Sequence, residues 1–273
     1  MDRIIAVNSN TYHGYSIDDA IDGIANAGFR YIELTATKGW TEHVFSDHTF
    51  SQLLHVKNEL KDRKLIPFSL SGHCNLMDPD RIQDFITNIE LASFFGCEYI
   101  VSSIGEAHID NKVDTSEKIA EENIATLIPI LRSHGMKLVL ETHGSIGTGV
   151  KMDRIVKNLN SAYVKINYDT ANVIFYGGVD PADDLSKCEK DVAYLHLKDK
   201  AGEPNEWNFP ALGDGYVDFP AIFRVLNKNN NNSPVSIEIE FTPQGPGSLE
   251  AVNNAVRKSY RYLEEHNFFN DEG

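Results

Sequence analysis

Short apolar runs rich in β-branched residues alternate with longer amphipathic stretches along the whole chain. The amphipathic stretches place apolar residues at helical spacing and are predicted as helices at 16–27, 50–63, 79–95, 116–134, 152–159, 181–187, 219–227 and 248–266. A glycine directly follows three of them, at positions 28, 96 and 135, as is usual where a helix ends. The apolar runs are predicted as strands at 4–8, 30–35, 66–71, 97–102, 137–142, 163–169, 192–199 and 234–241.

Strands that alternate with helices indicate βαβ units and a parallel sheet, which is an α/β fold. Eight such units average about 34 residues each, a length typical of a (β/α)8 barrel. The sequence therefore predicts a single (β/α)8 TIM barrel, with residues 1–273 as one domain. An open doubly wound sheet is the alternative, but the turn after the first strand, residues 8–12 (NSNTY), lacks the glycine fingerprint of that fold.

Polar residues recur at the carboxyl ends of the predicted strands and fall on one face of each strand. Strands of a parallel barrel are buried on both faces and are usually apolar, so polar residues on them indicate a specific structural or functional role. Side chains alternate along a strand, and the apolar set suits the outer face that packs on helices. The polar set must then point inward at the mouth of the barrel, where barrel active sites lie. It includes Glu33, His73, Glu141, His143, Asp169, His196, Lys198, Glu238 and Glu240.

Four of these residues, Glu141, Asp169, His196 and Glu238, come from four consecutive predicted strands. Each residue taken alone is better explained by a salt bridge, a surface position or a hydrogen-bonded core position. Together they gather three carboxylates and one imidazole in one buried place, which is costly unless the charge is neutralised. A divalent cation is the simplest neutraliser, and this donor set favours Mn²⁺, Zn²⁺ or Mg²⁺. We therefore expect one divalent metal ion as cofactor.

The segments that carry these residues resemble the motifs of the xylose isomerase-like TIM barrel superfamily. That superfamily includes sugar phosphate isomerases and epimerases, sugar 3-epimerases, inosose and dehydroshikimate dehydratases, and type IV AP endonucleases. The resemblance extends from the second to the eighth predicted strand. Its motifs are residues 140–143 (LETH), 168–172 (YDTAN), 195–199 (LHLKD), 213–219 (GDGYVDF) and 235–238 (VSIE).

The resemblance implies that Glu141, Asp169, His196 and Glu238 ligate the metal, and that Glu141 and Glu238 also act as a catalytic acid/base pair. Glu240 shares the strand face of Glu238 and is its rival, although the small-apolar pair before Glu238 matches the family motif better. Substrate contacts are expected from His73, His143, Asn172, Lys198, Glu33 and Glu240.

The implied function is a metal-dependent isomerase or epimerase of a sugar or cyclitol. It would abstract a proton α to a carbonyl and pass through a metal-stabilised enediolate. A dehydratase of a cyclic keto-polyol shares the first step and is the alternative. A non-catalytic sugar-binding barrel that keeps its metal is a third reading. Asn172 and Gly202 stand where several tagatose- or psicose-type epimerases have a histidine and an arginine, which weakens that assignment.

The net charge and the composition of the chain limit the classes of binding partner that it can have. The chain has 40 acidic and 25 basic side chains and a formal net charge of −15, which disfavours nucleic acid and anionic membranes. The endonuclease branch also needs three zinc ions and further histidines, yet residues 202–218 contain no histidine. We expect a small-molecule sugar or polyol as partner, while the sequence permits a homo-oligomer without specifying one.

The sequence contains no apolar run long enough for a transmembrane helix, and its first seven residues do not resemble a secretory signal. Cys74, Cys97 and Cys188 are too few and too scattered for a disulfide framework, so reduced thiols in a cytoplasmic protein are expected.

Aromatic residues are predicted in the loops at the barrel mouth. Trp207 and Phe209 follow the seventh strand, and either can cover a sugar face or anchor its own loop. The same two readings apply to Tyr12, His13 and Trp40.

Overall fold

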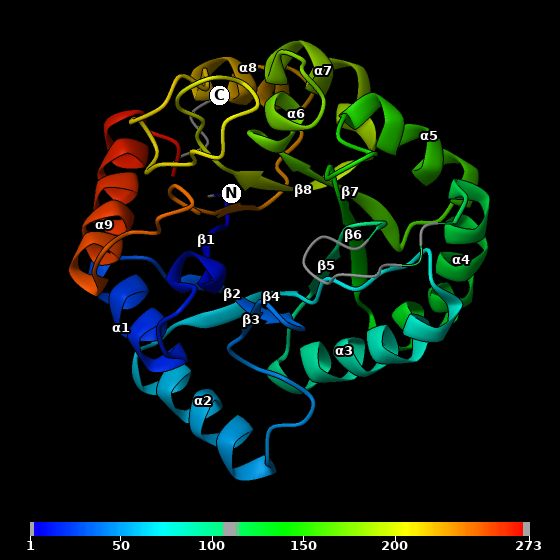
Figure 1. Cartoon of the computed structure of the whole chain (residues 1–273), viewed down its shortest axis with the longest axis horizontal. Helices are drawn as coiled ribbons and strands as arrows, with labels where there is room; N and C mark the ends of the chain where they lie inside the picture. The colour runs from blue at the N-terminus through cyan, green and yellow to red at the C-terminus, as the bar shows by residue number, and fades with distance from the viewer. Residues whose placement is uncertain (1–2, 106–112, 114, 270–273) are drawn as a thin grey trace.

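The first strand pairs in parallel with both the second and the last, so the sheet closes on itself (Figure 1). The computed structural model describes residues 3–105, 113 and 115–269. Within them, the predicted (β/α)8 barrel is confirmed. Its eight parallel strands are β1 (Ile5–Asn8), β2 (Tyr31–Thr37), β4 (Ile66–Ser71), β5 (Tyr99–Ser102), β6 (Lys137–Glu141), β7 (Val164–Asp169), β8 (Val192–Leu197) and β9 (Val235–Ile237).

Helices surround the barrel, and the first and last of them lie side by side (Figure 1). Polar caps define where they begin: Ser16, for example, forms a capping box with Asp19 at the start of α1. Gly28 ends α1 in the left-handed conformation that glycine adopts without strain, at a φ of 106°. The helices are α1 (Ile17–Ala27), α2 (Phe50–Asp62), α3 (Ile82–Phe95), α4 (Glu117–His134), α5 (Gly149–Leu159), α6 (Asn172–Phe175), α7 (Pro181–Cys188), α8 (Phe219–Lys228) and α9 (Leu249–Glu265).

The last barrel strand is shorter than predicted and ends at Ile237, which pairs with Val7 of β1. Beyond Ile237 the backbone leaves the sheet: the N–H of Ile239 donates to Thr11 Oγ1, and the N–H of Phe241 donates to the carbonyl of Phe209. Glu240 therefore lies in a loop, not on the predicted strand. Two further short elements were not predicted, the helix α6 and the strand β3 (Thr41–Glu42), which pairs antiparallel to β2.

Inward-facing apolar residues fill the barrel interior. They form a cluster of Phe68, Tyr99, Val101, Val139 and Tyr194. The rule that assigns the apolar residues of each predicted strand to the outer face is wrong for Phe68, in the strand predicted at 66–71. The register between β2 and β4 shifts at this point, so Phe68 and Ser69 both face inward.

The three cysteines are buried and free, as the sequence predicted. In the part of the chain that the structure describes, no helix combines the length and apolar character needed to span a membrane.

Candidate metal centre and active site

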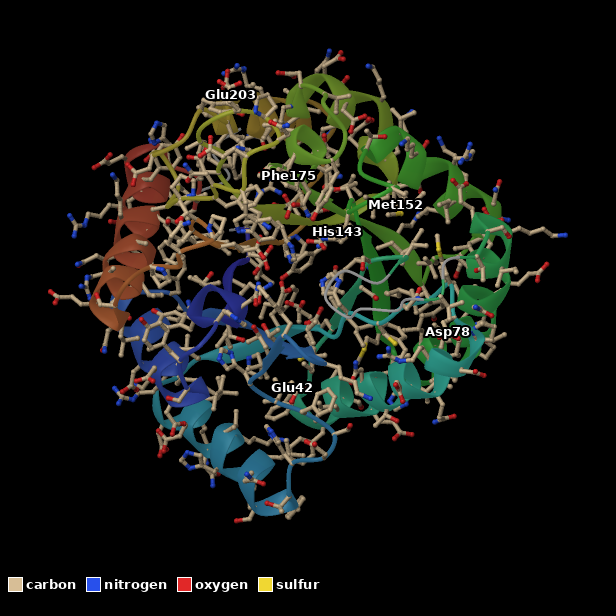
Figure 2. All side chains as sticks on the ribbon, in the orientation of Figure 1. Glu42, Asp78, His143, Met152, Phe175 and Glu203 are labelled. Carbon is tan, nitrogen blue, oxygen red and sulfur yellow. The ribbon has the colours of Figure 1, made fainter. Side chains whose placement is uncertain are left out.

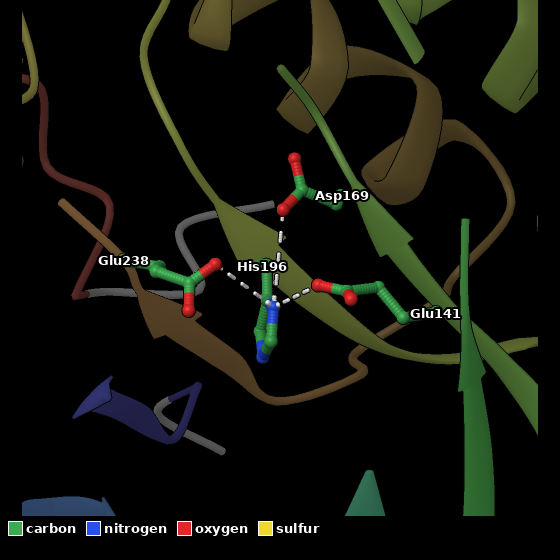
Figure 3. A group of neighbouring side chains, drawn as sticks. All are labelled: Glu141, Asp169, His196 and Glu238. Atoms are coloured by element: carbon green, nitrogen blue, oxygen red, sulfur yellow. Dashed lines mark hydrogen bonds and ion pairs between the residues drawn. The ribbon is translucent and has the colours of Figure 1, made fainter. Parts of the chain in front are cut away.

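Three carboxylates converge on one nitrogen of His196 (Figure 3). Its Nδ1 atom lies 2.8 Å from Glu141 Oε1, 3.7 Å from Glu238 Oε2 and 3.9 Å from Asp169 Oδ2. One ligand atom from each of the four residues lies within 4.8 Å of the others, and all four side chains are buried. They come from the carboxyl ends of β6, β7 and β8 and from the residue after β9. The structure thus brings together the four residues that the sequence predicted as ligands.

One carboxylate oxygen of Asp169 accepts hydrogen bonds, and the other accepts none. Its Oδ1 accepts hydrogen bonds from the backbone N–H groups of Ala171 and Asn172, at 2.9 and 2.8 Å, which fix the carboxylate. Its buried Oδ2, which faces His196 Nδ1, has no hydrogen-bond partner among the described residues. A buried carboxylate oxygen without a donor is rare in a native fold. Carboxylate oxygens and one imidazole nitrogen suit a divalent cation, so the residues present fit the expected metal.

Glu33 lies behind His196 rather than in the pocket wall. His196 Nε2 is 3.1 Å from Glu33 Oε1, and Glu33 also accepts from Asn8, Ser69 and Tyr194 at 3.1, 3.2 and 2.8 Å. The Glu33 side chain is fully buried and is not part of the pocket wall, so in this structure it supports His196 from behind. A carboxylate at Nε2 makes that nitrogen the donor and leaves Nδ1 to face the other three carboxylates.

The charges around His196 require a positive charge at Nδ1, either a proton or a metal ion. Burial by itself would lower the pKa of His196, but Glu33 and the hydrogen bond with Glu141 outweigh it and raise that pKa well above its usual value. Burial raises the pKa of Asp169 to about 8, and the neighbouring Glu141 and Glu238 add to the shift although Lys198 opposes it. The cluster therefore retains protons that a divalent cation would displace.

Lys198 is the second cation of the site. Its ammonium lies 3.2 Å from Glu238 Oε2, contacts Glu240, and stands 4.5 Å from the centre of the Phe209 ring. Burial would lower the pKa of Lys198, but Glu238 and Glu240 raise it well above its ordinary value, so the ammonium stays charged. Lys198 thereby forms ion pairs with both Glu238 and Glu240.

The two predicted acid/base residues are each oriented by their own partners. Glu238 Oε1 accepts from the side-chain amides of Asn8 and Asn10, at 3.0 and 3.2 Å. Glu141 Oε2 lies 3.5 Å from His73 Nε2, while the backbone N–H of Ser103 donates to Nδ1 of the same ring at 3.0 Å. A ring that accepts at Nδ1 carries its proton on Nε2, so His73 directs an N–H group at Glu141.

The pocket above these ligands contains most of the predicted substrate contacts. His73, His143, Asn172, Lys198 and Glu240 line it together with Glu141 and Glu238. Figure 2 shows His143 near the centre of the barrel, and its Nε2 lies 3.1 Å from the hydroxyl of Tyr176. Burial lowers the pKa of His143 to about 4, although the nearby charge of Glu141 acts to raise it, so this ring is neutral.

Several wall residues were not predicted from the sequence, namely Asn10, Thr37, Ser71 and Tyr176, whereas Trp40 and Trp207, which were expected either to cover a sugar or to anchor their loops, do line the pocket. The sequence did contain a signal for Asn8 and Asn10, because one amide ends the first predicted strand and the other lies two residues beyond it. Tyr176 had none, since it reaches the pocket only through the unpredicted helix α6.

Comparison with known proteins places the chain in a family. The family described as xylose isomerase-like TIM barrel matches residues 21–266. The chain belongs to this family. Among curated relatives of this xylose isomerase-like barrel, an inosose dehydratase from Clostridium beijerinckii is 25% identical over 214 residues, which cover 67% of this chain and 70% of that enzyme. Other inosose dehydratases match over 63% and 48% of their own lengths.

Solved structures of the same fold cover almost all of this xylose isomerase-like barrel. A xylose isomerase-like protein from Mycobacterium smegmatis in complex with magnesium superposes with a TM-score of 0.73 at 16% identity, covering 97% of both chains. A 3-keto-D-glucoside 4-epimerase from E. coli has a TM-score of 0.72 at 18% identity, and the match covers 96% of this chain and 99% of that one. At these identities the likeness shows the fold.

A long loop after β8 carries Trp207 and Phe209 over the site, and Asp199 anchors it in this barrel. The Asp199 carboxylate accepts from the backbone N–H groups of Gly213, Gly215 and Val217, at 2.9, 2.9 and 3.2 Å. Gly215 approaches so closely that a Cβ atom there would lie 2.2 Å from Asp199 Oδ1. The loop therefore depends on one buried carboxylate.

Replacing Asp199 by alanine should lower the free energy of unfolding by about 3 kcal/mol, because several buried N–H groups lose a charged acceptor. Urea denaturation would measure this change. Asp214→Ala in the same loop is the matched control, since Asp214 is half exposed and pairs with Lys258 at the surface. Equal stability of the two variants would contradict the anchoring role.

Replacing Glu33 by glutamine should weaken Mn²⁺ binding about tenfold or more, because outer-shell partners of a ligating histidine contribute on that scale. Titration calorimetry of the metal-free protein would measure the affinity. Glu90→Gln, on the exposed face of α3, is the control and should bind Mn²⁺ like the unaltered protein. Unchanged Mn²⁺ affinity in Glu33→Gln would show that Glu33 does not contribute to metal binding.

Proposed function

We propose that this protein is a divalent-metal-dependent enzyme that moves a proton on the carbon α to a carbonyl of a sugar or cyclitol, as an isomerase or epimerase. The observation that carries the proposal is the placement of Glu141 and Glu238 on two sides of one point, with Asp169 and His196 between them (Figure 3). A pair of carboxyl groups so placed can serve the two faces of a substrate.

The proposed roles follow from the contacts of each residue. One glutamate removes the proton from the α carbon, and the other returns a proton to that carbon or to its neighbour. Return to the same carbon from the opposite face inverts it, and return to the neighbouring carbon interconverts aldose and ketose. A cation held by the four ligands would supply positive charge to the oxygens that become negative when the proton leaves.

The pocket walls suit a polyhydroxylated, uncharged ligand. His143 offers a neutral ring, Asn172 offers an amide, and Tyr176 offers a hydroxyl. The buried Asn172 amide nitrogen has no hydrogen-bond partner among the described residues, so it is available to a ligand oxygen. Lys198 is held by Glu238 and Glu240, which balance its charge.

Dehydration of a cyclic keto-polyol is the second candidate, and two observations favour it. The curated relatives are inosose dehydratases. Lys198 also stands beside Glu238 and Glu240 in the pocket, where an N–H donor can hydrogen-bond to a departing β-hydroxyl. The first step, proton removal α to the carbonyl, is common to both candidates.

Deuterium uptake from D₂O distinguishes an isomerase or epimerase from a dehydratase and from a non-catalytic barrel. The Mn²⁺-loaded protein would be incubated with a panel of ketoses and inososes, and exchange would be followed by NMR together with ultraviolet absorbance. Exchange without an absorbance change is expected for an isomerase or epimerase. A rising enone absorbance would identify a dehydratase instead. Binding of a panel member without exchange would identify a non-catalytic barrel and contradict the proposal. The Glu141→Gln, Glu238→Gln double variant controls for background exchange.

A further inference from the structure

A second cavity, larger than the pocket at the metal centre, opens beside it at the barrel mouth. It has a volume of about 610 Å³, against about 20 Å³ for the inner pocket with its side chains as they stand. The cavities are contiguous, because Asn10, Trp40, Trp207 and Glu240 line both. The inner pocket leads to the ligand cluster, whereas the outer cavity has the size of a small-molecule site.

The outer cavity is built by loops from one side of the barrel. They follow β1, β2, β8 and β9, which are neighbours in the sheet (Figure 1). The β9 loop contributes Phe241, Thr242 and Pro243. None of these three lines the inner pocket, so the outer cavity can be altered without touching the ligands.

Two tryptophans of the cavity wall are held in place by their own contacts. The Trp40 indole N–H donates to Asn10 Oδ1 at 3.0 Å, and its ring stacks on His13 with centroids 4.1 Å apart. Trp207 packs edge-on against Phe175 and Phe209, with centroids 5.8 and 5.1 Å apart. Aromatic rings that are already fixed lose little freedom when a ligand ring packs on them.

The charge of the cavity restricts its occupant. Its lining contains one carboxylate, Glu240, and no lysine or arginine among the described residues. Burial lowers the pKa of His13, so that ring adds no positive charge. A phosphate, nucleotide or carboxylate substituent would meet no cation here, while an uncharged ring would meet aromatic faces and a few polar groups such as Asn10 and Thr242.

We propose that the substrate is a keto-glycoside, whose reacting sugar ring enters the inner pocket while its uncharged aglycone ring lies in the outer cavity against Trp40 and Trp207. This inference rests on the proposed function, because it adds a substrate class to the same site.

The test compares matched keto-sugars in the deuterium-exchange assay. The 3-keto derivative of phenyl β-D-glucoside should exchange with a kcat/KM about tenfold or more above that of 3-keto-D-glucose, through the aromatic contacts of the aglycone. Equal values would overturn the inference and leave the proposed function standing. No exchange in either compound, nor in the ketose and inosose panel, would overturn both.

A cavity-filling variant, Thr242→Trp, should bring the ratio of the two kcat/KM values close to one. Its matched control is Gln244→Trp, which carries the same side chain two residues away and outside the cavity lining. An unchanged ratio in Thr242→Trp would overturn the inference. Altered oligomeric state of Thr242→Trp on gel filtration, with the ratio unchanged, would instead identify the cavity as an interface between copies.

Intrinsic fluorescence supplies a readout that does not depend on activity or on a folded variant. The chain has only two tryptophans, and both line the cavity. Phenyl β-D-glucoside should therefore change the emission of the unaltered protein at concentrations at which D-glucose leaves it unchanged. The same response to both compounds would contradict an aglycone site.

Discussion

Replacing Glu141 or Glu238 by glutamine should each lower turnover by at least about 100-fold, the usual scale of a lost general acid or base, while substantial divalent metal is retained. Glutamine preserves the size and one oxygen donor of each side chain but removes the group that titrates. Both residues contribute to the ligand cluster, and each has separate hydrogen-bond partners that hold it in place. Turnover would be measured by deuterium exchange and metal content by elemental analysis.

Glu240→Gln is the matched control for this pair. Glu240 lines the same pocket and contacts Lys198, but it does not belong to the ligand cluster around His196. It should lose much less activity than either of the other two. An inactive Glu240→Gln beside an active Glu238→Gln would transfer the acid/base role to Glu240. Full activity in all three variants would contradict the proton-transfer mechanism.

Removal of the metal should abolish exchange, and adding back Mn²⁺ or Mg²⁺ should restore it. Without a cation the site holds three carboxylates around one imidazole, and one buried carboxylate oxygen accepts no hydrogen bond from the described residues. Elemental analysis should find about one divalent ion per chain in the purified protein, as one tetradentate cluster requires. A saturating metal should also stabilise the fold, by about 2.7 kcal/mol at a hundredfold excess over its dissociation constant.

The variant that tests the ligand assignment is the double replacement Glu141→Ala, His196→Ala, which should purify without bound metal. A matched control replaces an exposed glutamate and an exposed histidine, Glu90→Ala with His55→Ala, and should keep its metal. Full metal retention in the first variant would show that the ion is held elsewhere.

The ligand set could be predicted because it depends on local geometry. Side chains alternate along any strand, and the carboxyl ends of parallel strands meet at one end of a barrel. Glu141, Asp169 and His196 each lie at or near a strand end. The same rule predicted Glu238 correctly as a cluster member even though β9 ends one residue earlier.

Alternation says which face of a strand a residue occupies but not its height along the barrel, and this is why the sequence does not reveal that Glu33 lies against His196. Strands in a closed barrel tilt and stagger, so inward residues of equal parity lie in different layers. Glu33 pairs in register with Asn8 and with Ser69, and this brings it beneath His196, into contact with Tyr194. A register shift, which no local pattern reveals, likewise turned Phe68 inward.

The sequence alone determined the number of βα units, the barrel and the four-residue cluster, since these follow from the period of the side chains and from residue type. Only the tertiary structure decided that Glu33 supports His196, that Lys198 joins Glu238 to Glu240, and that Trp40 and Trp207 share a cavity. These contacts join segments separated by up to some 170 residues. They are set by strand stagger and by loop packing, which depend on the whole closed sheet and leave no periodic signal in any one segment.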